Sequence, residues 1–336
     1  HLLCLNRAWF VRFKLSLQPI EMSEEDDDVH FEPGHVIETS KAKFVVEKLL
    51  GEGGFGAVYR VTDQANPKAV FAMKVEKKKE ERKDSKLKME IAILKLVSAE
   101  RKERSHFTAI IDRGKRDTFF FLVMQMVGKS LADLKNKRAD KVFSMPTGLG
   151  AGSQCLEACE DLHKYGFIHR DLKPANYACG VGDKKRMVYI LDFGIARKIT
   201  NDKNELKTPR EKARFKGTVK FASLACHRNI EMGKKDDCES WFYLLIDIIQ
   251  PAGLPWKKMA QRDAVMRSKE DVRKNRDLIF TGLKPKLELG QIMDYIDKLQ
   301  YYDKVDYAYI YEVLKIACRT AGGSLDDPYD WERDED

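Results

Sequence analysis

The chain has 336 residues, of which 43% are hydrophobic, enough to bury a large core in one two-lobed domain or in two small ones. Its 61 basic and 53 acidic residues give a formal net charge of +8, which raises the question of a nucleic-acid partner. The most basic stretch, residues 77–88, is interrupted by acidic residues and has no aromatic stacking motif, so we expect a solvated surface and no nucleic-acid binding.

Cysteine usage indicates the cellular compartment that we expect for this protein, and hydropathy indicates whether it spans a membrane. Seven cysteines are scattered without a C-x-x-C pair, which favours a reducing compartment, and we expect a cytoplasmic protein with the nucleus as an alternative. Cys155 and Cys159 could share a metal on one helix face, but small buried packing groups are the stronger interpretation, and His163 is interpreted as an ordinary polar residue. The longest apolar run, residues 241–249, is broken by Asp247, so no membrane span is expected.

The first 43 residues are expected to form a disordered N-terminal extension. Residues 1–20 contain basic residues but no acids, a composition that can mark a mitochondrial presequence. Met22 then opens an acidic stretch, which is typical of an ordinary translation start followed by a tail. We favour the second interpretation, in which residues 1–21 are not part of the mature chain.

A glycine-rich turn follows the first predicted strand. Residues 44–50 and 57–61 are apolar and rich in β-branched and aromatic side chains, so they predict two strands around the turn at residues 51–56. A Gly-x-Gly-x-x-Gly pattern also opens dinucleotide-binding folds, but no helical period follows it here. Because glycines let backbone N–H groups approach phosphates closely, the turn predicts a flap over a nucleotide. Its expected nucleotide-binding residues are Gly51, Gly53, Gly54, Phe55 and Gly56.

The next strand and helix supply a cation and its partner. Residues 69–75 predict a strand that carries Lys74, a cation placed to contact phosphates. Residues 87–96 have the apolar spacing of an amphipathic helix, and Glu90 lies among the apolar positions. An unpaired carboxylate there would be costly, so we predict a buried ion pair between Lys74 and Glu90, both counted with the nucleotide-binding residues.

The most specific signal is the sequence His-Arg-Asp-Leu-Lys-Pro-Ala-Asn at residues 169–176. Asp171 is predicted to accept or orient the proton of an attacking hydroxyl, and Asn176 to hold a metal ion through its oxygen. A buried strand over residues 187–191 then delivers Asp192, which precedes Phe and Gly and is the expected second metal ligand. With the glycine turn and the strand lysine, this order and spacing predict phosphoryl transfer from ATP with Mg²⁺.

With these motifs the chain resembles a protein kinase of the casein kinase 1 group, most closely the tau-tubulin kinase branch and its relatives. The resemblance covers residues 44–320, and its group-specific part is residues 217–227, which stand where most kinases have Ala-Pro-Glu. Residues 228–237 and 253–258 suggest the tau-tubulin branch. In this family, Lys173 in the catalytic loop implies that serine and threonine, rather than tyrosine, accept the phosphoryl group, and that the lysine helps to stabilise it.

The resemblance also implies roles outside the catalytic motifs. Asp237 would brace the backbone of the catalytic loop, and Thr218 would contact Asp171 and Lys173. The residues that it places around the adenine are Val58, Ala72, Met124, Gln125, Val127, Ala178 and Leu191.

Members of this group often prefer acidic or already phosphorylated substrates. A basic pocket below the activation segment, which lies between Asp192 and Ser223, would anchor them. Lys220 matches one basic position of that pocket. Arg267 matches a second position on a gapless alignment, and Lys269 is an equal alternative. Thr200 and Thr208 in the activation segment could be phosphorylated, but members of the group are commonly active without this modification, so we predict basal activity.

We therefore predict an α+β protein with a two-lobed protein-kinase fold. An antiparallel sheet plus one helix would form the N-lobe, residues 44–125, and a mainly helical C-lobe would span residues 129–320, with ATP and Mg²⁺ between them. Residues 321–336 would be a short acidic tail. The expected partners of this monomer are protein substrates, cytoskeletal or acidic ones included. A kinase-fold scaffold without catalysis and a basic binding module are the alternatives, but neither explains the complete set of motifs.

Overall fold

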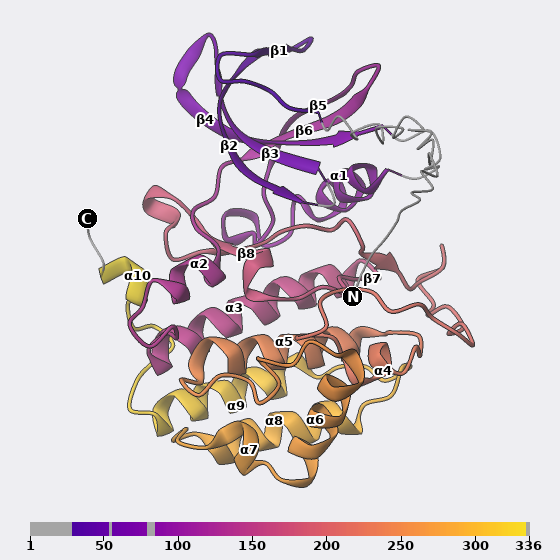
Figure 1. Ribbon diagram of the computed structural model, residues 1–336, viewed down its shortest axis with the longest axis vertical. Coiled ribbons are helices and arrows are strands. Elements are labelled where there is room, and N and C mark those ends of the chain that lie inside the picture. Colours follow the sequence, from indigo (N-terminus) through magenta and orange to yellow (C-terminus); the bar gives the residue numbers. More distant parts are fainter. Residues whose placement is uncertain (1–28, 54–55, 79–84, 334–336) are drawn as a thin grey trace, which may run out of the picture.

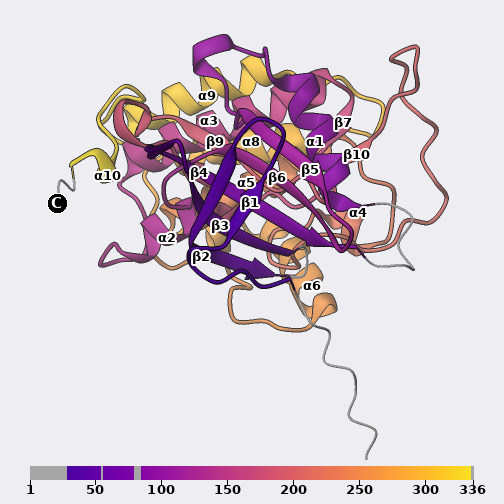
Figure 2. The same cartoon turned by 90° about the horizontal axis from the view of Figure 1, so that it is seen from above.

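The computed structural model describes residues 29–53, 56–78 and 85–333. In Figure 1 a sheet with one helix lies above a larger helical part, and Figure 2 views the same arrangement from the sheet side. The α+β architecture with an N-terminal antiparallel sheet is therefore confirmed. Gly54 and Phe55, both predicted to contact a nucleotide, lie outside the described residues, as do residues 1–28.

Six strands form the sheet of the N-lobe, in the antiparallel order β1-β2-β3-β4-β6-β5. Phe44, Tyr59, Met73 and Phe121 fill a core on one face, and α1 packs near the other. These elements are β1 (Val36–Glu38), β2 (Lys43–Gly53), β3 (Gly56–Asp63), β4 (Asn66–Lys77), β5 (Ile110–Lys115), β6 (Phe119–Gln125) and α1 (Lys86–Val97).

Helices form most of the C-lobe, around the long helices α3 (Met145–Lys164) and α5 (Lys234–Ile249). Residues 241–249 are all buried in α5, so the longest apolar run is a core helix. Within the described ranges, no helix has the length and apolarity that a membrane crossing needs. The remaining helices are α2 (Leu131–Asn136), α4 (Leu224–His227), α6 (Arg262–Lys274), α7 (Asp277–Phe280), α8 (Lys286–Lys298), α9 (Tyr307–Thr320) and α10 (Asp330–Arg333).

Two short strand pairs lie where the lobes meet. Strand β7 (Phe167–Ile168) pairs with β10 (Arg197–Lys198), and β8 (Tyr177–Cys179) pairs with β9 (Val188–Ile190). The short 3-10 helix Pro174–Asn176 lies between β7 and β8. The loop from residue 169 to residue 176 is therefore fixed at both ends by paired strands.

The expected disordered extension needs correction, because part of it belongs to the sheet. Strand β1 pairs with β2, and its Ile37 is only 4% exposed. Phe31 packs its ring against those of Tyr59 and Phe119. Apolar side chains at these positions cover the outer core of the sheet, so the folded unit begins before residue 44.

The C-terminal segment is a docked element rather than a free acidic tail. Tyr329 and Trp331 are 2% and 8% exposed. Asp330 accepts hydrogen bonds from the backbone N–H of Ser144 at 2.7 Å and from its hydroxyl at 2.6 Å, at the residue that precedes α3. Gly150 lets Tyr329 come close, because a Cβ there would lie 2.7 Å from the tyrosine ring. Burial of the two aromatic rings and the hydrogen bonds of Asp330 together dock this segment on α3.

Candidate active site

Lys74 on β4 lies between two carboxylates. Its Nζ is 2.6 Å from Glu90 Oε2 on α1 and 3.2 Å from Asp192 Oδ1, so the predicted ion pair with Glu90 is confirmed. Burial favours the neutral amine, but the two carboxylates outweigh it and hold the pKa of Lys74 above its ordinary value. Burial likewise disfavours ionised Asp192, yet Lys74 and His169 hold the pKa of Asp192 below its ordinary value. Both groups are therefore charged at neutral pH.

The position of Glu90 depends on how α1 begins. Glu76, near the end of β4, accepts hydrogen bonds from the backbone N–H groups of Lys86 at 3.1 Å and Leu87 at 2.7 Å. The Ser85 hydroxyl donates to Glu76 at 2.6 Å and accepts from the N–H of Lys88. These bonds satisfy the first N–H groups of the helix and tie it to the strand that carries Lys74. Sequence reasoning did not identify Glu76, which shares β4 with Lys74.

A hydrogen-bonded network surrounds the Asp171 carboxylate. The Thr218 hydroxyl donates to Asp171 Oδ1 at 2.7 Å, and Lys173 Nζ donates to Asp171 Oδ2 at 2.9 Å. Lys173 also donates to the Thr218 hydroxyl oxygen at 3.0 Å, so the contacts expected for Thr218 are confirmed. Gly217 permits them, because its φ is +94° and a Cβ there would lie 2.3 Å from the Arg170 carbonyl oxygen. The network holds a carboxylate that can accept a proton.

Asn176 and Asp192 are brought close together, because the backbone N–H of Leu191, directly before Asp192, donates to the Asn176 carbonyl oxygen at 2.8 Å. The Asn176 amide nitrogen donates to the carbonyl oxygen of Asp171 at 2.9 Å, so its amide oxygen is the atom that could bind a metal. Asp192 has a φ of +64°, a left-handed conformation that is uncommon for residues with a side chain and that recurs at functional sites. An ionised carboxylate and an amide oxygen are suitable ligands for a hard divalent cation such as Mg²⁺.

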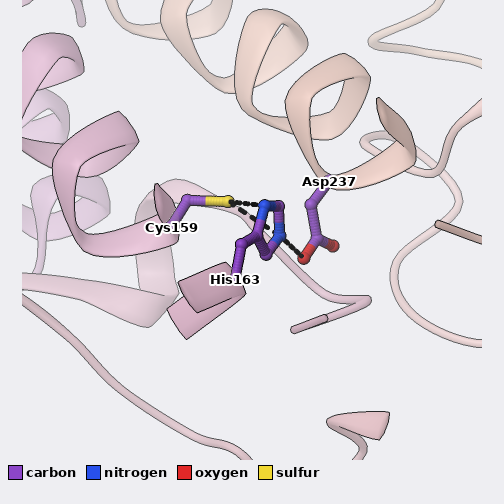
Figure 3. A group of neighbouring side chains, drawn as sticks. All are labelled: Cys159, His163 and Asp237. Carbon is purple, nitrogen blue, oxygen red and sulfur yellow. Dashed lines mark hydrogen bonds and ion pairs between the residues drawn. The ribbon is translucent and has the colours of Figure 1, made fainter. Parts of the chain in front are cut away.

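Asp237 on α5 supports the backbone of the catalytic loop, residues 169–176. It is 0% exposed, and its carboxylate accepts the backbone N–H of His169 at 2.6 Å and that of Arg170 at 2.9 Å, which confirms the predicted brace. Figure 3 shows His163 reaching Asp237 from one side and Cys159 close to the same ring. The distance from His163 Nε2 to Asp237 Oδ2 is 2.9 Å.

The buried group Cys159, His163 and Asp237 is explained by hydrogen bonding rather than by metal binding, although its ligand atoms all lie within 4.8 Å of one another. Burial raises the pKa of the Cys159 thiol, which keeps it protonated and unsuited to a metal. Both Asp237 oxygens already accept hydrogen bonds, and His163 Nδ1 lies 2.5 Å from the Tyr307 hydroxyl. The sequence analysis interpreted His163 as an ordinary polar residue and so missed that it links Tyr307 to Asp237. Its position shortly before residues 169–176 was the signal that could have indicated this contact.

Residues predicted to surround the adenine come from both lobes. Ala72 on β4 pairs with Met124 on β6, and both are buried. Ala178 on β8 forms a bridge with Ser130, just after the segment that joins the lobes. The N–H of Gln125 donates to the Ala109 carbonyl at 2.9 Å, so this donor is used within the protein. The other members of the set are Val58 on β3, Val127 in the joining segment and Leu191 directly before Asp192.

The basic residues predicted to bind an anionic substrate lie in different environments. Lys220 Nζ lies 2.6 Å from Asp247 Oδ1, and Lys135 Nζ lies 2.6 Å from the other oxygen of the same carboxylate. Arg267 is exposed on α6. Lys269, the alternative to Arg267, is wrong for this role because its side chain is fully buried.

Comparison with known proteins agrees with this geometry. The family model described as protein kinase domain matches residues 44–274. The chain is 31% identical to the serine/threonine-protein kinase spe-6 of Caenorhabditis elegans over 326 residues, which cover 94% of this chain and 83% of that protein. It is 30% identical over 306 residues to a Dictyostelium discoideum protein named "Probable serine/threonine-protein kinase", and these residues cover 91% of this chain and 59% of that protein. The chain therefore belongs to the protein kinase family, and it is a serine/threonine protein kinase.

Proposed function

We propose that Asp171, Lys74, Asn176 and Asp192 carry phosphoryl transfer from Mg²⁺-bound ATP to serine and threonine hydroxyls, with Lys173 stabilising the transferred group. The observation that carries this proposal is the charged arrangement in which Lys74 bridges Glu90 and Asp192, at 2.6 Å and 3.2 Å. Such a cation, pinned by two carboxylates, is pre-positioned to bind the α- and β-phosphates. Catalysis would then come from positioning and charge neutralisation.

Asn176 and Asp192 would hold Mg²⁺, which supplies charge neutralisation for the phosphates when bound. The fit rests on the low pKa of Asp192 and on the Asn176 amide, whose nitrogen is engaged by Asp171. Asp171 would orient the attacking hydroxyl and accept its proton. The hydrogen bonds from Thr218 and Lys173 hold its two carboxylate oxygens in position for this role. The glycine turn, Glu90 and the predicted adenine residues would complete the ATP site.

The finer assignment within the family is the casein kinase 1 group and its tau-tubulin branch, and the support for it is the sequence of residues 217–227. Acidic or phosphorylated protein substrates, cytoskeletal proteins among them, would follow from that assignment. Arg267 is the better candidate for the anion because it is exposed, whereas Lys220 already has a carboxylate partner. An Arg267→Ala variant should raise the KM for an acidic peptide several-fold and leave that for a neutral peptide unchanged. Equal effects on both peptides would refute the anion role.

A monomer in the cytoplasm, with the nucleus as an alternative, is the setting that we propose for this kinase. The cysteines are scattered in the sequence, and the six that the structure describes are free and buried, which supports a reducing compartment. Size-exclusion chromatography with light scattering tests the monomer, and imaging of a fluorescently tagged chain tests the compartment. A stable dimer or a secreted chain would overturn the respective proposal.

The central test measures phosphate transfer from ATP to casein with and without Mg²⁺, using the whole chain and its Asp171→Asn and Asp192→Asn variants. Transfer by the parent only in the presence of Mg²⁺, and loss of at least about 10²-fold in either variant, is the expected result. Asp183→Asn is the control, because this aspartate is exposed in the turn between β8 and β9. Full transfer by Asp171→Asn would refute the assigned role. ATP binding measured by thermal shift separates a lost chemical step from a lost nucleotide site.

A further inference from the structure

Lys269 on α6 is a fully buried amine beneath the segment that follows Thr218. Its side chain is 0% exposed, and Nζ donates to the carbonyl oxygens of Val219 at 2.9 Å and Ala222 at 2.6 Å. The third partner is His227 Nε2 at 3.1 Å. An ammonium group has three protons, and here it meets three acceptors. The charged form of Lys269 donates to all three when the His227 ring carries its proton on Nδ1.

The surroundings of Lys269 show that this burial is costly. Burial lowers the pKa of Lys269 to about 7, with Arg273 acting in the same direction and Glu239 and Cys226 against it. Burial, Lys269 and Arg262 lower the pKa of His227 to about 4, so its ring is neutral. The neutral ring can accept a hydrogen bond from the ammonium group of Lys269. The ammonium also faces the ring of Tyr243 at 4.8 Å on α5.

The same segment is held at a second point and leads directly to the catalytic carboxylate. The Trp256 indole N–H donates to the Lys220 carbonyl at 2.8 Å, next to the two carbonyls that Lys269 binds. Thr218, the residue directly before Val219, donates a hydrogen bond from its hydroxyl to Asp171 at 2.7 Å. A protein substrate that brings a hydroxyl to Asp171 must therefore pass close to residues 219–222.

We propose that Lys269 is a positioning residue for the protein substrate: its charged amine fixes residues 219–222 in the conformation that receives the substrate chain beside Asp171. This inference rests on the proposed role of Asp171. It predicts an effect on substrate binding that is separate from ATP binding, because the partners that Lys269 has among the described residues are not ones assigned to the nucleotide.

The proposal makes substrate use depend on pH in a defined direction. A neutral amine can still donate to the carbonyls of Val219 and Ala222, but both bonds lose their charge assistance and weaken as the pH rises through about 7, the pKa of Lys269. We expect kcat/KM for the protein substrate to fall roughly threefold to tenfold across this range, a loss comparable to that of one hydrogen bond. The KM for ATP should not follow the same curve.

The first test compares the parent chain with Lys269→Met, which keeps an unbranched buried side chain, and with Lys274→Met as the matched control. Lys274 is exposed on the same helix and forms an ion pair with Asp271 at 3.2 Å. With casein as substrate, Lys269→Met should lose roughly 10- to 100-fold in kcat/KM for the protein and keep the KM for ATP within about twofold. Its kcat/KM for casein should also no longer fall as the pH rises through about 7. Lys274→Met should match the parent. A Lys269→Met protein with the parent's KM for casein and its pH profile would overturn the proposal, and so would an equal rise in both KM values.

A second measurement needs no variant, so it decides the question even if Lys269→Met does not fold. Hydrogen–deuterium exchange of the parent at pH 6 and at pH 8.5, corrected for intrinsic exchange rates, should show lower protection of the amides of residues 221 and 222 at the higher pH. Both amides donate to the Thr218 carbonyl at 2.9 Å. Unchanged protection of these amides would refute the role of Lys269 even if Asp171→Asn is inactive, which separates this failure from failure of the proposed function.

Discussion

Replacement of Asp237 by asparagine should weaken both the stability and the catalytic loop of this kinase. The carboxylate accepts three donors, the N–H groups of His169 and Arg170 and the His163 ring nitrogen. Asparagine keeps one oxygen and turns an NH₂ group toward at least one donor, so a charge-assisted bond of about 1.5–3 kcal/mol is lost and a buried donor is left unsatisfied. The sum is a loss of about 3–5 kcal/mol in the free energy of unfolding.

The pKa of Asp237 sets the pH dependence of this loss. Burial disfavours the ionised form, but His163 and the His169 amide outweigh it and hold the pKa of Asp237 below its ordinary value. A carboxylate with a lowered folded-state pKa stabilises the protein above its unfolded-state pKa of about 3.9 and loses this effect as the pH falls through the folded-state pKa. The stability difference between parent and variant should therefore be complete at neutral pH and shrink in acid.

Thermal and urea unfolding at pH 7, together with steady-state kinetics, provide the assay. Because the loop that carries Asp171 loses its support, kcat should fall roughly 10- to 100-fold while the KM for ATP changes little. Asp236→Asn is the matched control: this buried neighbour on α5 accepts from the Gly233 N–H and from Lys235 instead of the catalytic loop, so it should cost stability without the loss of kcat. A stability loss below about 1 kcal/mol with unchanged kcat in Asp237→Asn would refute the reasoning.

Three other changes have defined outcomes. Glu90→Gln removes a carboxylate from Lys74 and should lower kcat/KM for ATP about 10²-fold in steady-state kinetics; parent-like values would contradict the ion-pair argument. Trp331→Ala removes a buried ring and its N–H bond to the Lys185 carbonyl, and should cost about 3–5 kcal/mol in denaturant unfolding, whereas a loss under about 1 kcal/mol would mean that the C-terminal segment is not a stabilising element. Replacing Thr200 and Thr208 together by alanine should leave phosphate transfer to casein within about threefold of the parent, since Thr200 is buried; abolished transfer would show that activation requires phosphorylation.

The fold class and the chemistry of the site were predictable from the sequence, because their signals are local. Asp171 and Asn176 lie in one short loop, where the residue types and their spacing are sufficient to indicate phosphoryl transfer. The pair between Lys74 and Glu90 was also predictable, since a carboxylate among the apolar positions of a helix needs a buried cation. The roles of these residues in the reaction remain predictions.

Other features depend on contacts between distant parts of the chain and were therefore missed or wrong. Composition indicated an acidic C-terminal tail, yet Asp330 bonds to Ser144, 186 positions earlier, and anchors a docked helix. Lys269 looked like a second surface cation, but helix α6 places it in the interior, with 0% of the residue exposed.

What the sequence by itself determined is the set of reactive groups and the periodic patterns that build each lobe. Only the tertiary structure decided which polar groups are buried and which atoms satisfy them, as for His163 behind the catalytic loop and Lys269 beneath residues 219–222. The physical reason is that desolvation and hydrogen bonding depend on the atoms that surround a side chain, and most of those atoms belong to residues that are remote in sequence.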